Sequence, residues 1–197
     1  MKLQDIRGNE HVKRAIEVAL VGDLSVTFVG NRELAILFAN SVLVEKGYLN
    51  VHYQKLCLCG NFGSPQMCIC TNEEINSLRK SDIYRENMSA HIVIQVVEQR
   101  FEQIIAKRLP KSDEAILERA TKARSNYTNY SIHDLDETCS RLLGMFYEQN
   151  YINQIVVDRI MEVASAIAAL DVRKGIQPAH LAEALQYSGL KYLEYLS

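Results

Sequence analysis

Apolar residues recur with two different periods along the chain, and these periods predict its helices and strands. Three short runs are mostly apolar or β-branched, which is typical of buried strands: residues 24–29, 49–56 and 91–97. Helical spacing and turn residues predict helices over residues 10–21, 33–46 and 73–86. Asn9 is placed to cap the first helix. In the second helix, Leu34, Ile36 and Leu37 are expected to pack on the sheet.

The rest of the chain is predicted to be helical. The expected helices cover residues 98–108, 112–124, 134–149 and 154–172, and a last one begins at Pro178. Asp134 is placed to cap the third of these. The polar stretch over residues 125–131 is the best boundary. We therefore expect an α/β core with a small, mostly parallel sheet over residues 1–125, and a helical domain over residues 126–197.

The composition is that of an ordinary soluble globular protein. The 197 residues are 48% hydrophobic and 23% charged, and a formal net charge of −2 gives no general attraction to nucleic acid or anionic membrane. No apolar run approaches the ~18–20 residues that span a bilayer, and the N-terminus lacks the apolar core of a signal peptide. We therefore expect a cytoplasmic protein without a membrane partner.

A local excess of cations lies in residues 100–124, which hold seven Lys/Arg against four Asp/Glu. Such a charge pattern is more often a solvated helix face than a binding surface. It nevertheless leaves nucleic acid as a possible partner.

The stretch "LSVTFVGNRELAILFA", residues 24–39, predicts a strand, a glycine turn and a helix, an arrangement that often holds phosphate at the helix N-terminus. A P-loop also needs a long glycine-rich turn, a lysine for the phosphates and a Ser/Thr for magnesium. Here the turn is only "GNRE", and the chain contains no Gly-Lys-Ser or Gly-Lys-Thr. We therefore predict that Gly30 serves a tight turn, that ATP is not bound and that the protein is not an ATPase.

The strongest local signal is "CLCGNFGSPQMCIC", which contains a C-x-C-x8-C-x-C pattern. Cys57, Cys59, Cys68 and Cys70 can form two facing pairs, and four thiolates suit tetrahedral zinc. Two alternatives stay open. Buried free thiols behave as small hydrophobes, and disulfides are disfavoured in a reducing cytosol.

The other chemistry-bearing residues give no comparable pattern. Cys139 stands apart on a helix and is expected in the core, while His52 stays open as a further metal ligand. The five histidines are scattered, so they do not support a Cys–His–Asp nucleophile. We predict no catalytic and no nucleotide-cofactor residues.

Several segments resemble the magnesium-chelatase-like AAA+ ATPases of the ComM/YifB type. "DIRGNEHVKRAIEVAL" resembles the helix that opens the family's core, and "CLCGNFGSPQMCIC" is similar to its cysteine segment. "SNYTNYSIHDLDETC" and "VVDRIMEVASAIAALDVRKGIQPAHLAEALQYSG" resemble its C-terminal helical lid, most specifically over Ile176 to Tyr187. The resemblance implies a reduced AAA+-like three-layer core with a helical lid bundle.

The chain departs from the family at the positions that carry its chemistry. The P-loop is shortened, and the segment that would supply the metal-binding acidic strand and pore loops is missing between Glu45 and Val51. "YRENMSAHIVI" replaces the segment that supplies an arginine finger. In the lid, Arg159 matches a family arginine, but Glu162 stands where a second basic residue is usual. Walker A, Walker B and the arginine finger are thus predicted to be lost, and with them phosphoryl-transfer catalysis.

These features lead to three functional hypotheses. The first is a catalytically inactive relative that acts as an adaptor or pseudo-ATPase subunit, through a protein partner or a homo-oligomer. The second is a nucleic-acid-associated module that contains zinc, and the third is a residual nucleotide binder. A sheet of few strands also leaves edges near its centre, so we expect either a covered edge or an oligomer.

Overall fold

The computed structural model describes residues 2–41, 47, 49–62, 66–98 and 112–194. The helix predicted over residues 98–108, and the cations within residues 99–111, lie outside these ranges. Within the described part of the chain, no helix is both long and apolar enough to cross a bilayer.

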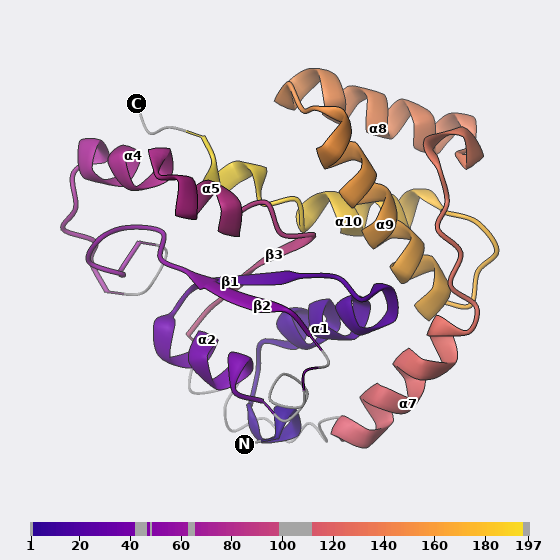
Figure 1. The fold of residues 1–197 in the computed structure, drawn as a ribbon, viewed down its shortest axis with the longest axis horizontal. Helices are drawn as coiled ribbons and strands as arrows, with labels where there is room; N and C mark the ends of the chain where they lie inside the picture. The colour runs from indigo at the N-terminus through magenta and orange to yellow at the C-terminus, as the bar shows by residue number, and fades with distance from the viewer. Residues whose placement is uncertain (1, 42–46, 48, 63–65, 99–111, 195–197) are drawn as a thin grey trace.

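A parallel sheet of three strands lies at the centre of the molecule (Figure 1). β1 (Val26–Gly30) is the middle strand, and β2 (Val51–Gln54) and β3 (Ile92–Val96) pair with it on either side in parallel register. This sheet, with helices between and after its strands, confirms the predicted α/β class and the small parallel sheet.

Eight α-helices are described: α1 (Glu10–Gly22), α2 (Arg32–Ala39), α4 (Asn72–Lys80), α5 (Asp82–Asn87), α7 (Asp113–Arg124), α8 (Glu137–Asn150), α9 (Gln154–Leu170) and α10 (Pro178–Gln186). Short 3-10 turns cover Leu3–Asp5, Ile132–Asp134 and Leu190–Tyr192. Pro178 occupies the first turn of α10, as predicted.

Two predicted helices differ from the observed ones in extent. Of the helix expected over residues 33–46, α2 ends at Ala39, where Asn40 and Ser41 close its last turn through their backbone N–H groups, and residues 42–46 lie outside the described ranges. The helix expected over residues 73–86 is two helices. Ser81 has an extended backbone between them, and its side chain caps α5 by accepting from the Tyr84 N–H.

One predicted cap was wrong, and one was confirmed in position only, since Asn9 is the N-cap residue of α1. Asp136 rather than Asp134 caps α8, by accepting from the Cys139 N–H, while Asp134 accepts from Ser131 in the preceding 3-10 turn. Asn9 precedes α1, but its side chain makes no cap hydrogen bond. Residue propensity alone cannot decide which of two neighbouring aspartates caps a helix. A side chain at a cap position can also form its hydrogen bonds with a distant part of the chain instead.

Helices cover both faces of the sheet, which gives three layers (Figure 1). Alternate residues of β1 point to opposite faces. Val26 and Phe28 belong to the large buried cluster with α1 and α2, whereas Val29 belongs to a small cluster with α5. Thr27 on this second face donates to the Asn87 carbonyl oxygen at 2.6 Å.

The packing of α2 also differs from the sequence prediction. Ala35 and Phe38 are its buried residues, and the Phe38 ring lies 5.9 Å from that of Phe28. Leu34 and Leu37 pack at the margin of the core, but Ile36 is exposed. The prediction for Ile36 was wrong because a short helix buries only the stripe that faces the sheet.

The outer edge of β3 is covered by the chain's own groups. The Asn9 side chain donates to the Val97 carbonyl at 2.9 Å and accepts from its N–H at 3.1 Å. His11 Nε2 donates to the Gln95 carbonyl at 2.8 Å, and the Val93 N–H donates to the Tyr187 carbonyl at 2.8 Å. This edge is therefore protected from pairing with another strand.

The C-terminal helices pack directly on the α/β part. α9 lies against α1, and a single large buried cluster contains residues of both. Arg14 forms two ion pairs between the two parts, to Glu183 at 3.1 Å and to Asp171 at 3.3 Å, and His91 Nε2 donates a hydrogen bond to Glu162 at 2.8 Å. The helical part is thereby fixed to the sheet by burial and by charge.

We predict that Gly30→Ala lowers the free energy of unfolding by about 3 kcal/mol. Gly30 has a φ of +99°, and an added Cβ would lie 2.6 Å from the Val96 carbonyl oxygen. Urea unfolding measures the change. The matched control is Gly144→Ala in α8, where a Cβ meets nothing within 4 Å and should stabilise the helix by about 0.5–1 kcal/mol. Equal stability of the two variants would contradict the tight turn.

Candidate metal centre

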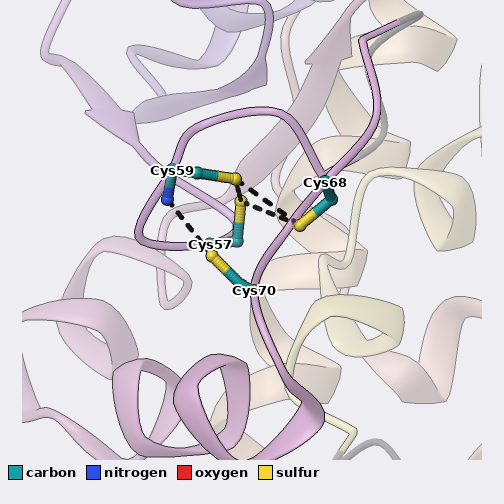
Figure 2. Close-up of side chains that lie close together, drawn as sticks. All are labelled: Cys57, Cys59, Cys68 and Cys70. Atoms are coloured by element: carbon teal, nitrogen blue, oxygen red, sulfur yellow. Dashed lines mark hydrogen bonds between the residues drawn. The ribbon is translucent and has the colours of Figure 1, made fainter.

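The loop between β2 and α4 brings the four predicted cysteines together (Figure 2). It begins just after β2, so the sheet fixes the position of Cys57. A turn at Gly60, whose φ is +85°, returns the chain and lets its N–H donate to the Cys57 carbonyl. Thr71 ends the loop, because it forms a capping box with Glu74 that starts α4 immediately after Cys70.

The sulfur atoms converge as metal ligands do. Cys57 Sγ lies 3.4 Å from Cys59 Sγ, and Cys68 Sγ lies 3.6 Å from each of them. With the sulfur of Cys70 included, all four sulfurs lie within 4.8 Å of one another. A tetrahedral ion with metal–sulfur bonds of about 2.3 Å requires sulfur separations of about 3.8 Å. Little movement would therefore give this group tetrahedral geometry.

Backbone N–H groups point at all four sulfurs. Phe62 N–H donates to Cys57 Sγ at 3.2 Å, and Cys59 N–H donates to Cys70 Sγ at 3.3 Å. Asn61 and Ile69 donate to Cys59, and Cys70 donates to Cys68. Hydrogen bonds of this kind favour thiolates over thiols, so the loop is suited to the negative charge of a metal–thiolate group.

Two of the thiols differ strongly in acidity. The N–H groups of Asn61 and Ile69 lower the pKa of Cys59 to about 6. The Cys70 N–H lowers the pKa of Cys68, but burial and the sulfurs of Cys59 and Cys57 outweigh it and raise this pKa to about 12. Because the four sulfurs are closely spaced, the first thiolate to form repels the formation of a second one. A cation bound between the sulfurs would relieve this repulsion.

The geometry bears on the alternatives that the sequence left open. All five cysteines are free thiols, and no disulfide joins them. Cys57 is buried, but the other three cysteines of the group are half-exposed, which is unlike thiols that only fill a core. Cys139 is fully buried in the helical part, where its thiol donates to the Ile176 carbonyl. His52 is exposed, and in the described part of the chain the metal-ligating group contains only the four cysteines.

The turn that could have held a phosphate is closed by neighbouring groups. Asn31 caps α2 by accepting from the Leu34 N–H at 3.0 Å, and its own N–H donates to the Val96 carbonyl at 3.0 Å. The Tyr53 hydroxyl donates to the Gly30 carbonyl at 3.4 Å. The N–H groups of Asn31 and Leu34 are thus already used, although they lie where a phosphate would need donors.

One constellation was missed by the sequence analysis. His91 accepts at Nδ1 from the Ser25 N–H at 3.3 Å and from its hydroxyl at 2.8 Å, and donates from Nε2 to Glu162. The imidazole therefore connects the starts of β1 and β3 with α9. These residues are far apart in sequence, and no local pattern indicated that they meet.

Comparison with known families identifies the helical part of the chain. The family model described as "Magnesium chelatase, subunit ChlI C-terminal" matches residues 87–188, just over half of the 197 residues. The match includes β3 and α7 to α10, and ends before the 3-10 turn at Leu190. It does not include the cysteine loop. No curated protein matches the sequence.

We predict that protein purified without added metal contains about one metal ion per chain, and that this ion is zinc. Elemental analysis measures it. Cys68→Ser should lose the metal and become less soluble, because it removes one of four ligands. Cys139→Ser is the matched control: it changes a buried thiol outside the cluster and should keep the metal. A folded, metal-free protein would contradict the site.

Proposed function

This chain belongs to the magnesium chelatase family through the C-terminal region of subunit ChlI, and we propose that it acts as a zinc-stabilised adaptor that binds proteins without hydrolysing ATP. The narrower relationship to the ComM/YifB type stays a prediction from its sequence segments. Both the loss of catalysis and the adaptor role are inferred from the Gly30 turn and the cysteine loop.

The closed turn at Gly30 is the observation that carries the proposal. A phosphate-binding turn presents free N–H groups at a helix N-terminus. Here the Asn31 side chain takes the Leu34 N–H, and the Asn31 N–H is bound to Val96. Arg32 and Glu33 follow directly, so the first turn of α2 carries a carboxylate as well as a cation. A nucleotide would have to displace contacts that already stabilise the fold.

Zinc bound to Cys57, Cys59, Cys68 and Cys70 would have four protein ligands and no open position. Such a site supplies structure rather than Lewis-acid chemistry, because catalytic zinc keeps one position for water or substrate. The metal would cross-link the two ends of the loop and hold it against the sheet. Its role in this proposal is to fix the shape of a surface.

That surface exposes unusually large apolar side chains. Met67 is 85% exposed, Ile69 82% and Leu58 56%. They are next to the ligands in sequence, and Leu58 and Ile69 each lie between two of them. When the cysteines turn inward, these neighbours are directed outward. Exposed apolar groups on a rigid loop are typical of protein-binding surfaces, which supports the adaptor role.

Within the described residues, no observation favours the nucleic-acid alternative. Two of the cations in residues 100–124 bind the chain itself: Arg119 pairs with Glu17, and Arg124 donates to the Leu20 and Val21 carbonyls. These side chains hold α7 on α1. The part of α7 that carries them therefore serves packing rather than a phosphate backbone.

We predict that titration calorimetry with ATP and magnesium gives no saturable heat up to about 1 mM nucleotide, a bound of about −4 kcal/mol on the binding free energy. Phosphate release should equal that of buffer. An active ATPase under the same conditions is the positive control. Micromolar binding with turnover would contradict the proposal and favour a nucleotide-dependent role.

The exposed side chains of Met67 and Ile69 are expected to contact other copies of the chain. We expect the protein to self-associate as its concentration rises, and Met67→Ser combined with Ile69→Ser to weaken that association, because both side chains would leave water on contact. Sedimentation velocity measures it. Ile155→Ser is the matched control, since it removes an exposed isoleucine at the start of α9. Association unchanged in the double variant would place the interface elsewhere.

A further inference from the structure

The C-terminal segment Leu190–Glu194 returns across the sheet face that carries α5. The Tyr84 hydroxyl of α5 donates to the Tyr192 carbonyl at 2.9 Å, and the Tyr192 hydroxyl donates to Gln95 Oε1 at 3.4 Å. Tyr192 is buried, and Leu193 packs beside it in the small cluster on this face. Figure 1 shows this end of the chain beside α4 and α5.

Arg79 of α4 connects this segment with the metal loop. It is only 3% exposed, and it donates from a terminal guanidinium nitrogen to the Glu194 carbonyl. Its guanidinium carbon lies 5.8 Å from the centroid of the Phe62 ring, in a cation–π arrangement. Its Nε atom is buried with no hydrogen-bond partner, and Arg79 forms no ion pair with a carboxylate within the described ranges.

Because Arg79 is buried, its contact with Glu194 depends on the groups that shield the guanidinium from water. A buried cation that pairs with no carboxylate among the described residues carries a large desolvation cost, which the Phe62 face, the Glu194 carbonyl and the Tyr84 side chain offset only in part. If Phe62 moves away, water can reach the guanidinium. Arg79 then has less need of Glu194, and the segment loses one of its attachments.

Phe62 is itself held by the metal loop. Its backbone N–H donates to Cys57 Sγ at 3.2 Å, and its ring packs in the small cluster with Leu56 and Tyr84. A continuous series of contacts therefore runs from a metal ligand through Phe62 and Arg79 to Glu194. Each step is a direct contact between side chain or backbone atoms.

We propose that metal occupancy of the cysteine loop controls docking of Leu190–Glu194, with Phe62 and Arg79 as the connecting residues. The inference rests on the proposed metal binding. With metal bound, Cys57 is fixed, so Phe62 covers Arg79 and the segment stays docked. Without metal, nothing cross-links the two ends of the loop, so the loop and Phe62 loosen and the segment is released.

Release would alter a groove on the molecular surface. The segment contributes Leu190, Lys191 and Glu194 to a groove of about 630 Å³, whose other side includes Gln95 of β3 and Phe146 of α8. A groove of this size is large enough for a ligand or a side chain of a partner. The metal state of the loop would thus be transmitted to a second surface of the protein.

Hydrogen exchange followed by mass spectrometry tests the coupling, with zinc-loaded protein compared with protein treated with a chelator. We expect the amides of residues 190–194 to exchange about tenfold faster without zinc, the factor that corresponds to one contact of about 1.4 kcal/mol. The amides of α9 should not change, which shows that the fold is intact. A change below about twofold in residues 190–194 would overturn the coupling.

Two variants identify the connecting residues. Phe62→Leu keeps an apolar side chain and the backbone donor, so zinc content should be normal while residues 190–194 exchange fast in both states. Arg79→Gln tests the same connection from α4, should Phe62→Leu fail to fold. Met67→Ser, in the same loop but exposed, should respond to zinc as the unaltered protein does.

The result separates this inference from the one on which it rests. Zinc bound in the expected amount, with no response of residues 190–194, overturns the coupling alone. Absence of zinc from purified and reconstituted protein overturns the metal site and the coupling together.

Discussion

Burial of the central strand β1 between two helical layers is the constraint on which the rest of the structure depends. All five of its residues are buried, and it supplies hydrogen bonds to both neighbouring strands. A three-stranded sheet covers little area, so the apolar face formed by Val26 and Phe28 must be completed by helices. Helices α1 and α2 provide this cover, and α9 packs on α1, which explains why the C-terminal helices share the main core.

The same small sheet has edges that need protection. On the β3 side, Asn9, His11 and Tyr187 bind the outward backbone groups of Val93, Gln95 and Val97. At the turn that contains Gly30, the side chains of Asn31 and Tyr53 bind backbone groups. In both places the chain satisfies its own polar backbone, which stabilises the monomer but removes donors that a ligand could use.

The second face of the sheet has a small apolar cluster, so other interactions must stabilise it. Among the described residues, six are buried in this cluster, and Tyr84, Tyr192 and Leu56 come from three separate segments. A metal cross-link in the adjoining loop would compensate for limited burial, as in small domains that rely on structural zinc. Arg79 and Phe62 lie where this loop, α4 and the C-terminal segment meet, so this face connects the metal centre with the end of the chain.

The sequence by itself determined the α/β class, the three strands and the cysteine cluster, because these depend on local periodicity and on close spacing. Cys57 and Cys59 are paired by their separation alone, and Gly30 was expected at a tight turn. Only the tertiary structure decided which partners distant residues meet. The Asn9 side chain binds Val97 instead of the first turn of α1, Ile36 points to water, and Arg79 reaches Phe62 and Glu194. Periodicity reports which face of an element is apolar, but the partner of a polar side chain depends on where the fold brings the free backbone groups, and that information is not local.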